Sequence, residues 1–457
     1  MQNKNNEDYL YILSQIGVLT EKEYPLNYGN RRLAKTYQYF ESRISEFSYK
    51  EITRLLKKIN QTLLVMIEVN SQSDAFILFE SINNTGVPLS AIDLIKNYTL
   101  AEAEKQGALN IDDAFKKWQI IANNLNNDYG YQERYFRQFY NAYKFRSDIR
   151  ILGINRATRS NLIKIYEKLL SKNVSAVFNE LLEKSEIYKT FINPKEYANE
   201  KIYKQSLIDL LHVGASPAYS FLLYLFGIER DDKKIKNIIE FLVKYFVRRN
   251  LTNFPATYEL DTIFIRLVEQ CEANRDKATD DLVVEFLSKP DYLISQNIFE
   301  ERLKGNIYIE NTEITRFILC YIEQKNQDKE TYVDLWQKNE KNKYIWTIEH
   351  IFPEGEKIPK SWVDMIAKGN YQEAETLQGE LVHTLGNLTI TGFNPELSNR
   401  PFLDKRDMKD KLGKNKKGYK NGLFLNEKIA KLSKWTAEDI KNRTKELIKK
   451  AIQYFEI

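Results

Sequence analysis

Helical periodicity over residues 110–340 constrains the fold of this chain more than any other feature. Five segments in this range repeat apolar residues with a period near 3.6, as in an α-helix with one buried face. They are FKKWQIIANNL (115–125), ERYFRQFYNAY (133–143), NLIKIYEKLL (161–170), SAVFNELLEKSEIY (175–188) and KIKNIIEFLVKYFVRR (234–249). Their aromatic residues follow the same spacing, which indicates core packing rather than stacking on nucleic-acid bases. The sequence therefore predicts a mainly α protein with a helical domain over residues 106–340.

The preceding segment, residues 1–105, has a mixed pattern that predicts a strand as well as helices. TLLVMIEV (62–69) is a β-branched run typical of a strand, and DAFILFESI (74–82) has helical spacing. After a loop of turn residues, Ser90 is able to cap the next helix, with Asp93 in place of the Glu of a capping box. We therefore expect residues 1–105 to be the remnant of a mixed α/β domain.

The pattern changes near residue 341, where two β-prone runs enclose a helical insert. The runs are 344–350 and 381–391, and the insert is 361–380. The chain closes with amphipathic segments, and Thr436, followed by Glu438 and Asp439, is a good helix start. These patterns predict a smaller α+β domain over residues 341–457.

Cysteine and histidine are both rare, which limits the metal sites that the chain can build. Its 457 residues include two cysteines, Cys271 and Cys320, far apart in sequence, and only three histidines. This excludes a cysteine-built zinc site, disfavours a histidine cage and fits a reducing cytoplasm. A bound metal would have mainly oxygen ligands, which favours Mg²⁺ or Mn²⁺. No apolar run approaches the ~20 residues of a membrane span, and the first residues lack a secretory-signal pattern.

Positive charge is concentrated in residues 405–420. The chain has a net charge of +5, and this segment holds eight Lys/Arg and two Asp, or +6, so the remaining residues sum to −1. Such a segment is either a solvated face or a phosphate-binding surface. Taken alone, the charge pattern favours the solvated face.

A group of polar residues in the C-terminal domain suits the cleavage of a phosphodiester bond. That reaction needs a base to deprotonate water, a cation on the scissile phosphate and a scaffold that holds both. Glu349 and His350, at the end of the first predicted strand, offer an acidic ligand and a base. Asn399 follows the turn NPELS and is placed to open a helix as a second oxygen ligand. The alternative is that His350 is a strand-edge histidine without a role.

The adjacency of Glu349 and His350 sets a geometric condition. Neighbours on a regular strand point to opposite faces, so both side chains reach one site only where the strand bends into its loop. Pro353 and Gly355 favour a bend near the pair. If the strand stays regular through His350 and the two side chains diverge, the assignment of Glu349 as a metal ligand fails.

Three motifs in this domain occur in a fixed order: IEHIFP (348–353), HTLGNLTIT (383–391) and ELSNRPFLDKR (396–406). Together they resemble the His-Asn-His nuclease domain with an HxxP motif of the GmrSD-like type IV restriction endonucleases, and the similarity covers about 341–457. FESINNTGVPLSAIDLIKNY and YFVRRNLTNFPATYELDTIF resemble the helical part of the partner domain in the same proteins. The resemblance implies a ββα-metal fold. It also implies a metal-dependent endonuclease or nickase that cleaves DNA, in restriction of phage or modified DNA.

Carried over residue by residue, the resemblance assigns roles to four polar side chains. It makes His350 the general base, with Glu349 and Asn399 as ligands of one divalent metal, Mg²⁺ or Mn²⁺. It makes Asn387 the residue that ties the loop between the strands and helps to orient His350.

The resemblance also extends to basic residues. Lys405 would face the phosphate backbone or the charge of the transition state. His383 has two interpretations of equal weight, a phosphate or metal contact and a structural role. Beside a metal site, the basic segment is better interpreted as a phosphate-binding wall than as a solvated face. The predicted nucleic-acid contacts are Lys405, Arg406, Lys409, Lys411, Lys414, Lys416 and Lys417.

One feature of the related proteins is missing. Residues 1–110 contain no Asp-Gly-Gln-Gln-Arg-like motif, with which the relatives bind and hydrolyse nucleoside triphosphate. The chain is therefore a truncated version, or works with a separate N-terminal nucleotide-hydrolysing partner, or acts without nucleotide, and we do not predict nucleotide hydrolysis. Because this motif is missing, a second hypothesis stays open: the chain is a catalytically idle adaptor or sensor that binds DNA or protein. The presence of His350 and Asn399 favours the enzyme, and nothing in the residues separates DNA from RNA as its substrate.

Two features of the helical domain favour structural roles. His212 lies among apolar residues, which predicts a core or capping histidine with a hydrogen bond. Arg248 and Arg249 could contact phosphate, but an ion-paired helix terminus is the favoured interpretation. With no clustered titratable motif, this domain is expected to recognise the target or to couple the missing domain to the nuclease.

Overall fold

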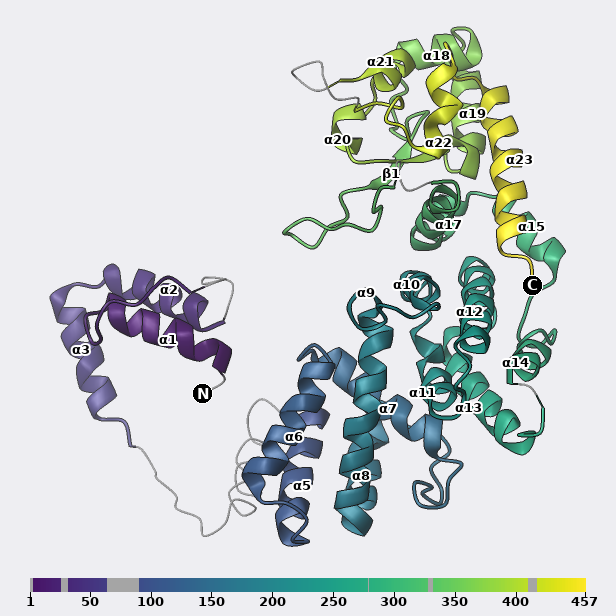
Figure 1. Ribbon diagram of the computed structural model, residues 1–457. Coiled ribbons are helices and arrows are strands. Elements are labelled where there is room, and N and C mark those ends of the chain that lie inside the picture. Colours follow the sequence, from purple (N-terminus) through teal and green to yellow (C-terminus); the bar gives the residue numbers. More distant parts are fainter. Residues whose placement is uncertain (1–2, 26–31, 64–89, 278, 328–331, 410–416) are drawn as a thin grey trace. The chain divides into compact units, whose positions relative to one another are not determined.

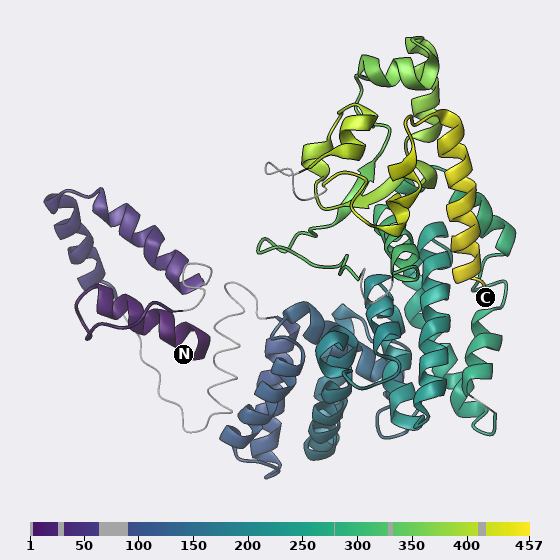
Figure 2. The same ribbon diagram turned by 45° about the horizontal axis from the view of Figure 1, so that its top comes forward.

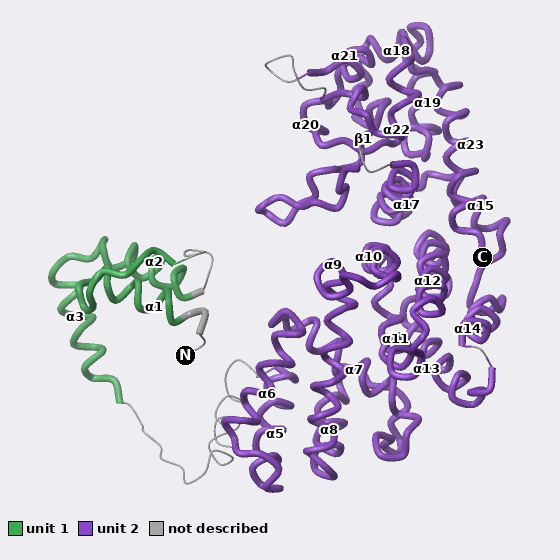
Figure 3. The backbone as a smooth tube through the Cα atoms, in the orientation of Figure 1, with its two compact units in different colours: residues 1–70 green, residues 71–457 purple. Residues whose placement is uncertain are grey.

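Two compact units, residues 1–70 and 71–457, make up the chain in the computed structural model (Figure 3). The structure describes residues 3–25, 32–63, 90–277, 279–327, 332–409 and 417–457. The first unit contains α1 (Asn3–Gln15), α2 (Arg32–Ser45) and α3 (Tyr49–Asn60). The strand predicted at 62–69 lies almost wholly outside the described residues, and the helix predicted at 74–82 lies entirely outside them, so both stay predictions.

Helices dominate the second unit up to residue 324 (Figure 1). They are α5 (Ala91–Lys105), α6 (Ile111–Asn124), α7 (Tyr129–Tyr143), α8 (Leu162–Ile192), α9 (Pro194–Tyr197), α10 (Lys204–His212), α11 (Tyr219–Ile228), α12 (Asp232–Thr252), α13 (Thr257–Ala273), α14 (Thr279–Leu287), α15 (Gln296–Lys304), α16 (Ile307–Glu310) and α17 (Thr312–Gln324). The mainly α prediction is confirmed. Among the described residues, no helix is both long and apolar enough to cross a membrane.

Helix starts predicted from the sequence are found where expected. Ser90 caps α5, because its hydroxyl accepts a hydrogen bond from the backbone N–H of Asp93. Thr436 caps α23 (Ala437–Tyr454) in a reciprocal capping box with Asp439. Both caps depend only on residues within one helical turn, so the sequence is sufficient to predict them.

The C-terminal part holds the small sheet among short helices. Strand β1 (Thr347–His350) pairs antiparallel with β2 (Leu388–Thr391), and His350 lies opposite Leu388. The helices around them are α18 (Lys360–Ala367), α19 (Tyr371–Leu381), α20 (Asn394–Leu397), α21 (Phe402–Asp407), α22 (Phe424–Glu427) and α23. Both strands are shorter than predicted. Residue 381 ends a helix and Leu385–Asn387 form a 3-10 turn, so the second strand begins only at Leu388.

Side chains from both parts of the second unit build its main apolar core. This core runs from the long helices to Leu388 on β2 and Leu447 on α23, and a smaller one surrounds Trp362 and Trp435. The carboxylate of Glu323 on α17 accepts hydrogen bonds from the backbone N–H groups of Phe424 and Leu425 at the start of α22. The predicted boundary at 340/341 thus lies inside one compact unit, and as a domain boundary it stays a prediction.

Helix α23 packs along this C-terminal part, against α19, α15 and the turn before β2 (Figures 1 and 2). The approach to the turn is close: a Cβ added to Gly386 would lie 2.2 Å from the carbonyl oxygen of Ile440 and 2.6 Å from the backbone nitrogen of Thr444. Only glycine fits here without moving the backbone of α23.

Gly386→Ala should therefore destabilise the protein by about 3 kcal/mol, the upper part of the usual range for overpacking. Gly379→Ala on α19 is the matched control, because among the described residues nothing lies within 4 Å of the position that its Cβ would take. In that exposed helical setting alanine should stabilise by about 0.5–1 kcal/mol. Urea denaturation of both variants measures the difference, and equal effects would contradict the close packing at Gly386.

Candidate active site

The end of β1 carries Glu349 and His350 into the candidate site. The register with β2 is unbroken from Thr347 to His350, and the bend begins only at Ile351. The strand was predicted to bend at Glu349 and His350, and this predicted position is wrong by one residue. As a consequence, the two side chains have separate neighbours: Lys405 and Tyr419 for Glu349, and His383 with Tyr308 for His350.

A buried lysine holds the carboxylate of Glu349. Lys405 Nζ lies 2.7 Å from Glu349 Oε1, and it also donates to the carbonyl oxygens of His350 (2.9 Å) and Ile351 (3.1 Å). The hydroxyl of Tyr419 donates to the same Oε1 at 3.2 Å. Burial raises the pKa of Glu349 and lowers the pKa of Lys405, so desolvation opposes the attraction within the pair. Among the described residues, no hydrogen bond reaches Oε2 of Glu349.

The prediction that Lys405 faces a phosphate backbone is wrong. Its side chain is fully buried, and its ammonium group already has three acceptors within the chain. An ammonium has three N–H donors, so none is left for a phosphate oxygen. Lys405 instead fixes the backbone just after the strand.

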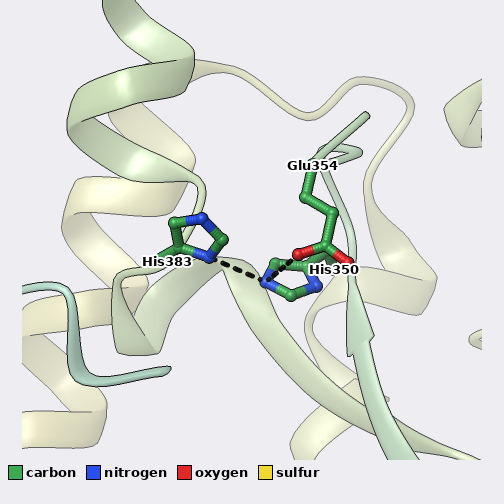
Figure 4. Close-up of side chains that lie close together, drawn as sticks. All are labelled: His350, Glu354 and His383. Carbon is green, nitrogen blue, oxygen red and sulfur yellow. Dashed lines mark hydrogen bonds and ion pairs between the residues drawn. The ribbon is translucent and has the colours of Figure 1, made fainter. Parts of the chain in front are cut away.

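His350 meets His383 and Glu354 on the other side of the strand (Figure 4). Its Nε2 atom lies 3.2 Å from His383 Nδ1 and 3.6 Å from Glu354 Oε2. The ring of Tyr308 packs edge-on against His350 and stacks on His383. Burial, with smaller contributions from His383 and Lys405, lowers the pKa of His350 to about 3. The imidazole is therefore uncharged at neutral pH and has a free electron pair.

Asn387 ties the loop that follows His350. Its amide nitrogen donates to the carbonyl oxygens of Phe352 and Val382, and its Oδ1 accepts from Phe352 N–H and from Trp435 Nε1. The backbone N–H of Ile351 donates to the Asn387 carbonyl. None of these hydrogen bonds is to the imidazole of His350. Asn387 therefore orients that ring only indirectly, by fixing the backbone of residues 351–352.

A cavity of about 710 Å³ opens at this end of the sheet. Glu349, His350, Glu354 and Asn399 are among the residues that line it. Asn399 does not open a helix as predicted: it lies in the turn between α20 and α21, and α21 begins three residues later at Phe402. Its side chain lies beside Gly355, where a Cβ would come within 3.2 Å of Asn399 Nδ2.

Comparison with family models identifies the two ends of the chain. A model described as GmrSD restriction endonucleases, C-terminal domain, matches residues 293–450. A model described as GmrSD restriction endonuclease, N-terminal domain, matches residues 1–100. The chain belongs to the GmrSD restriction endonucleases. Comparison with curated proteins finds no match.

Membership in the GmrSD family gives the chain a DNA-cleaving restriction role. The C-terminal match spans the whole candidate site, from Tyr308 to Tyr419. The N-terminal match covers the first unit and α5 as far as Leu100. The family resemblance inferred from the three motifs is thus confirmed.

The basic segment of this GmrSD chain is only partly described. Arg406 is held by Asp407 and by the carbonyl oxygen of Leu432, while Lys417 lies 3.5 Å from Glu396 and over the ring of Phe393. Lys409 is exposed. Lys411, Lys414 and Lys416 lie outside the described residues, so their predicted contacts stay predictions.

Two residues of the site, Glu354 and Tyr308, were missed by the sequence analysis. Glu354 follows His350 by four positions, and acidic character so near a candidate base was a usable signal. Tyr308 lies on α16, and its backbone N–H donates to the carbonyl oxygen of His383 at 3.4 Å. Because it comes from the helical part, no local pattern linked it to the nuclease motifs.

Three residues of the helical part lie outside this site. The ring of His212 stacks on that of Trp336, with 3.8 Å between the ring centroids. Its Nδ1 has no hydrogen-bond partner among the described residues, so the predicted hydrogen bond is not found at that atom. Arg248 and Arg249 are buried, and each donates to a backbone carbonyl, of Phe455 and Pro255 respectively. The predicted ion-paired helix terminus is therefore wrong, since the described partners are neutral.

Proposed function

We propose that this chain is a metal-dependent endonuclease or nickase of the His-Asn-His type, acting in the cytoplasm in restriction of phage or modified DNA. The observation that carries the proposal is the cavity at the end of β1, lined by Glu349, His350 and Asn399 together. It brings a neutral imidazole and two oxygen-bearing side chains to one solvent-accessible space. These are the groups that hydrolysis of a phosphodiester bond requires.

The donors in this cavity fit a hard divalent cation. Glu349 has one carboxylate oxygen, Oε2, without a hydrogen bond among the described residues, and Asn399 offers an amide oxygen. Oxygen ligands of this kind suit Mg²⁺ or Mn²⁺. When bound, such a cation stabilises negative charge on the scissile phosphate and on the leaving oxygen. Strand β1 is regular through His350, and the side chains of Glu349 and His350 have separate neighbours, which counts against Glu349 as a ligand. The proposal keeps Glu349 because both side chains line the same cavity.

The residues of the chain would supply the proton transfer and its geometry. His350 accepts a proton from water as the water oxygen bonds to phosphorus and the bond from phosphorus to the leaving oxygen breaks. Its ring is held between His383, Glu354 and Tyr308. Lys405 and Asn387 fix the backbone on either side of residue 351.

The basic segment would bind the DNA backbone beside this cavity. Lys409 is exposed, and we extend the proposal to Arg406, Lys411, Lys414, Lys416 and Lys417. For Arg406 and Lys417, binding has to exchange partners within the chain for phosphate oxygens. Such contacts make affinity fall steeply with salt concentration.

A plasmid-nicking assay tests the proposed function. Supercoiled DNA, plain and base-modified, is incubated with the full chain and Mg²⁺ or Mn²⁺, then with EDTA, and then with metal restored in excess. We expect cutting that stops with EDTA and returns with metal. Nicked circles indicate a nickase and linear product indicates double-strand cutting. An RNA substrate in parallel decides between DNA and RNA.

The same assay also tests the alternative hypothesis that the chain is a catalytically idle adaptor. If neither DNA is cut under any metal condition, and addition of nucleoside triphosphate changes nothing, the proposed enzyme activity is refuted for the isolated chain. Retarded DNA migration without cutting would then favour the adaptor or sensor that needs a separate N-terminal partner.

A further inference from the structure

A second group of possible metal ligands lies at the edge of the cavity, where His350 and Glu354 line it and His383 lies beside His350. His350 Nε2, His383 Nδ1 and a carboxylate oxygen of Glu354 all lie within 4.8 Å of one another, and the three side chains converge (Figure 4). Glu349 does not belong to this group. We infer that His350, His383 and Glu354 bind a transition-metal dication such as Zn²⁺, and that this cation inhibits the nuclease.

The distances between the three side chains are compatible with a tetrahedral metal, although 3.2 Å between two ring nitrogens is also a hydrogen-bond distance. With metal–nitrogen and metal–oxygen bonds of about 2.0–2.1 Å, tetrahedral ligand atoms lie roughly 3.3–3.4 Å apart. His350 Nε2 lies 3.2 Å from His383 Nδ1 and 3.6 Å from Glu354 Oε2. Two of the three ligand separations are therefore already close to the required value. The third closes by rotation of Glu354, whose side chain is 52% exposed.

The ligand types select the metal. Two imidazoles and one carboxylate suit Zn²⁺, Co²⁺ or Ni²⁺, whereas Mg²⁺ strongly prefers oxygen. Three protein ligands leave a fourth position, and the cavity that His350 and Glu354 line gives a water molecule access to it. Tyr308 supports the arrangement, since it packs on both histidine rings and binds the backbone of His383.

The inhibitory effect rests on the proposed function and follows from the chemistry of imidazole. A neutral imidazole has one free nitrogen electron pair, and its other nitrogen bears hydrogen. A cation on Nε2 of His350 uses that pair, so the ring is unable to accept a proton from water. Binding of the transition metal and action as a base are therefore mutually exclusive at His350.

Cobalt spectroscopy tests the site without relying on nuclease activity. The EDTA-treated full chain is titrated with Co²⁺, and we expect visible absorption of a four-coordinate complex that saturates at one equivalent. His383→Ala and Glu354→Gln should each raise the Kd for Co²⁺ by more than about tenfold, because even outer-sphere partners contribute 10- to 100-fold. Glu356→Gln, an exposed glutamate two residues further on, is the matched control and should leave the Kd unchanged. Absence of the band, or equal Kd values in all variants, would overturn the site.

Zinc inhibition tests the consequence. Nicking is measured at saturating Mg²⁺ with added Zn²⁺, and each protein is normalised to its own rate without Zn²⁺. The Zn²⁺ concentration for half inhibition should rise more than about tenfold in Glu354→Gln but not in Glu356→Gln. Equal sensitivity would overturn the inhibitory role. A cobalt band in a chain that never nicks DNA would refute the proposed function and leave the metal site standing.

Discussion

His350→Ala is expected to slow metal-dependent nicking by about 10²- to 10⁴-fold, the usual contribution of a general base. The imidazole is uncharged at neutral pH because burial lowers its pKa to about 3. It also lines the cavity that holds the proposed metal ligands. Alanine removes the proton acceptor but leaves Glu349, Asn399 and the exposed basic residues in place. The rate should therefore fall while affinity for DNA changes little, which single-turnover nicking at saturating enzyme measures.

The matched control for His350→Ala is His212→Ala. His212, on α10, is likewise in contact with an aromatic ring, that of Trp336, but it lies outside the cavity. It should nick at the wild-type rate. Thermal unfolding by circular dichroism confirms that both variants are folded. Equal rates in wild type and His350→Ala would show that another group takes the proton from water.

Local sequence signals were sufficient for much of the fold. Helical periodicity predicted α6, α7, α12 and both halves of α8, and one-turn patterns located the caps at Ser90 and Thr436. In the C-terminal part, both strands predicted from the β-prone runs were too long. The 3-10 turn at Leu385–Asn387 interrupts the second run because Gly386 packs directly against α23, a contact between residues more than 50 positions apart.

The candidate site shows where sequence reasoning fails for a physical reason. Asn387 and His350 were identified from motifs, because each lies in a short stretch of sequence that carries the family pattern. The burial of Lys405 was not, because a lysine in a basic segment is expected to be exposed until its tertiary partner, Glu349, is known. Glu354 and Tyr308 reach His350 from a loop and from a helix of the other part. Only the folded chain brings these groups together.

Lys405→Met is expected to destabilise the protein by about 3–5 kcal/mol, the usual cost of removing one partner of a buried ion pair. The substitution leaves the carboxylate of Glu349, which is 2% exposed, without its cation. It also leaves the carbonyl oxygens of His350 and Ile351 without a donor. Urea denaturation measures the change in unfolding free energy. Lys428→Met is the matched control, since Lys428 pairs with Glu446 at the same 2.7 Å but with side chains 73% and 52% exposed. It should cost less than about 1 kcal/mol.

The double variant Glu349→Gln/Lys405→Met separates loss of the pair from loss of packing. Burial shifts both pKa values toward the neutral forms, so the ion pair gains little over a neutral replacement of similar size. Glutamine keeps an oxygen for the Tyr419 hydroxyl, and methionine fills the lysine's space. The double variant should therefore be more stable than Lys405→Met alone. If it is equally unstable, the cost lies in the freed carbonyl oxygens of residues 350 and 351, and Lys405 then acts mainly as the clamp on the backbone that carries the base.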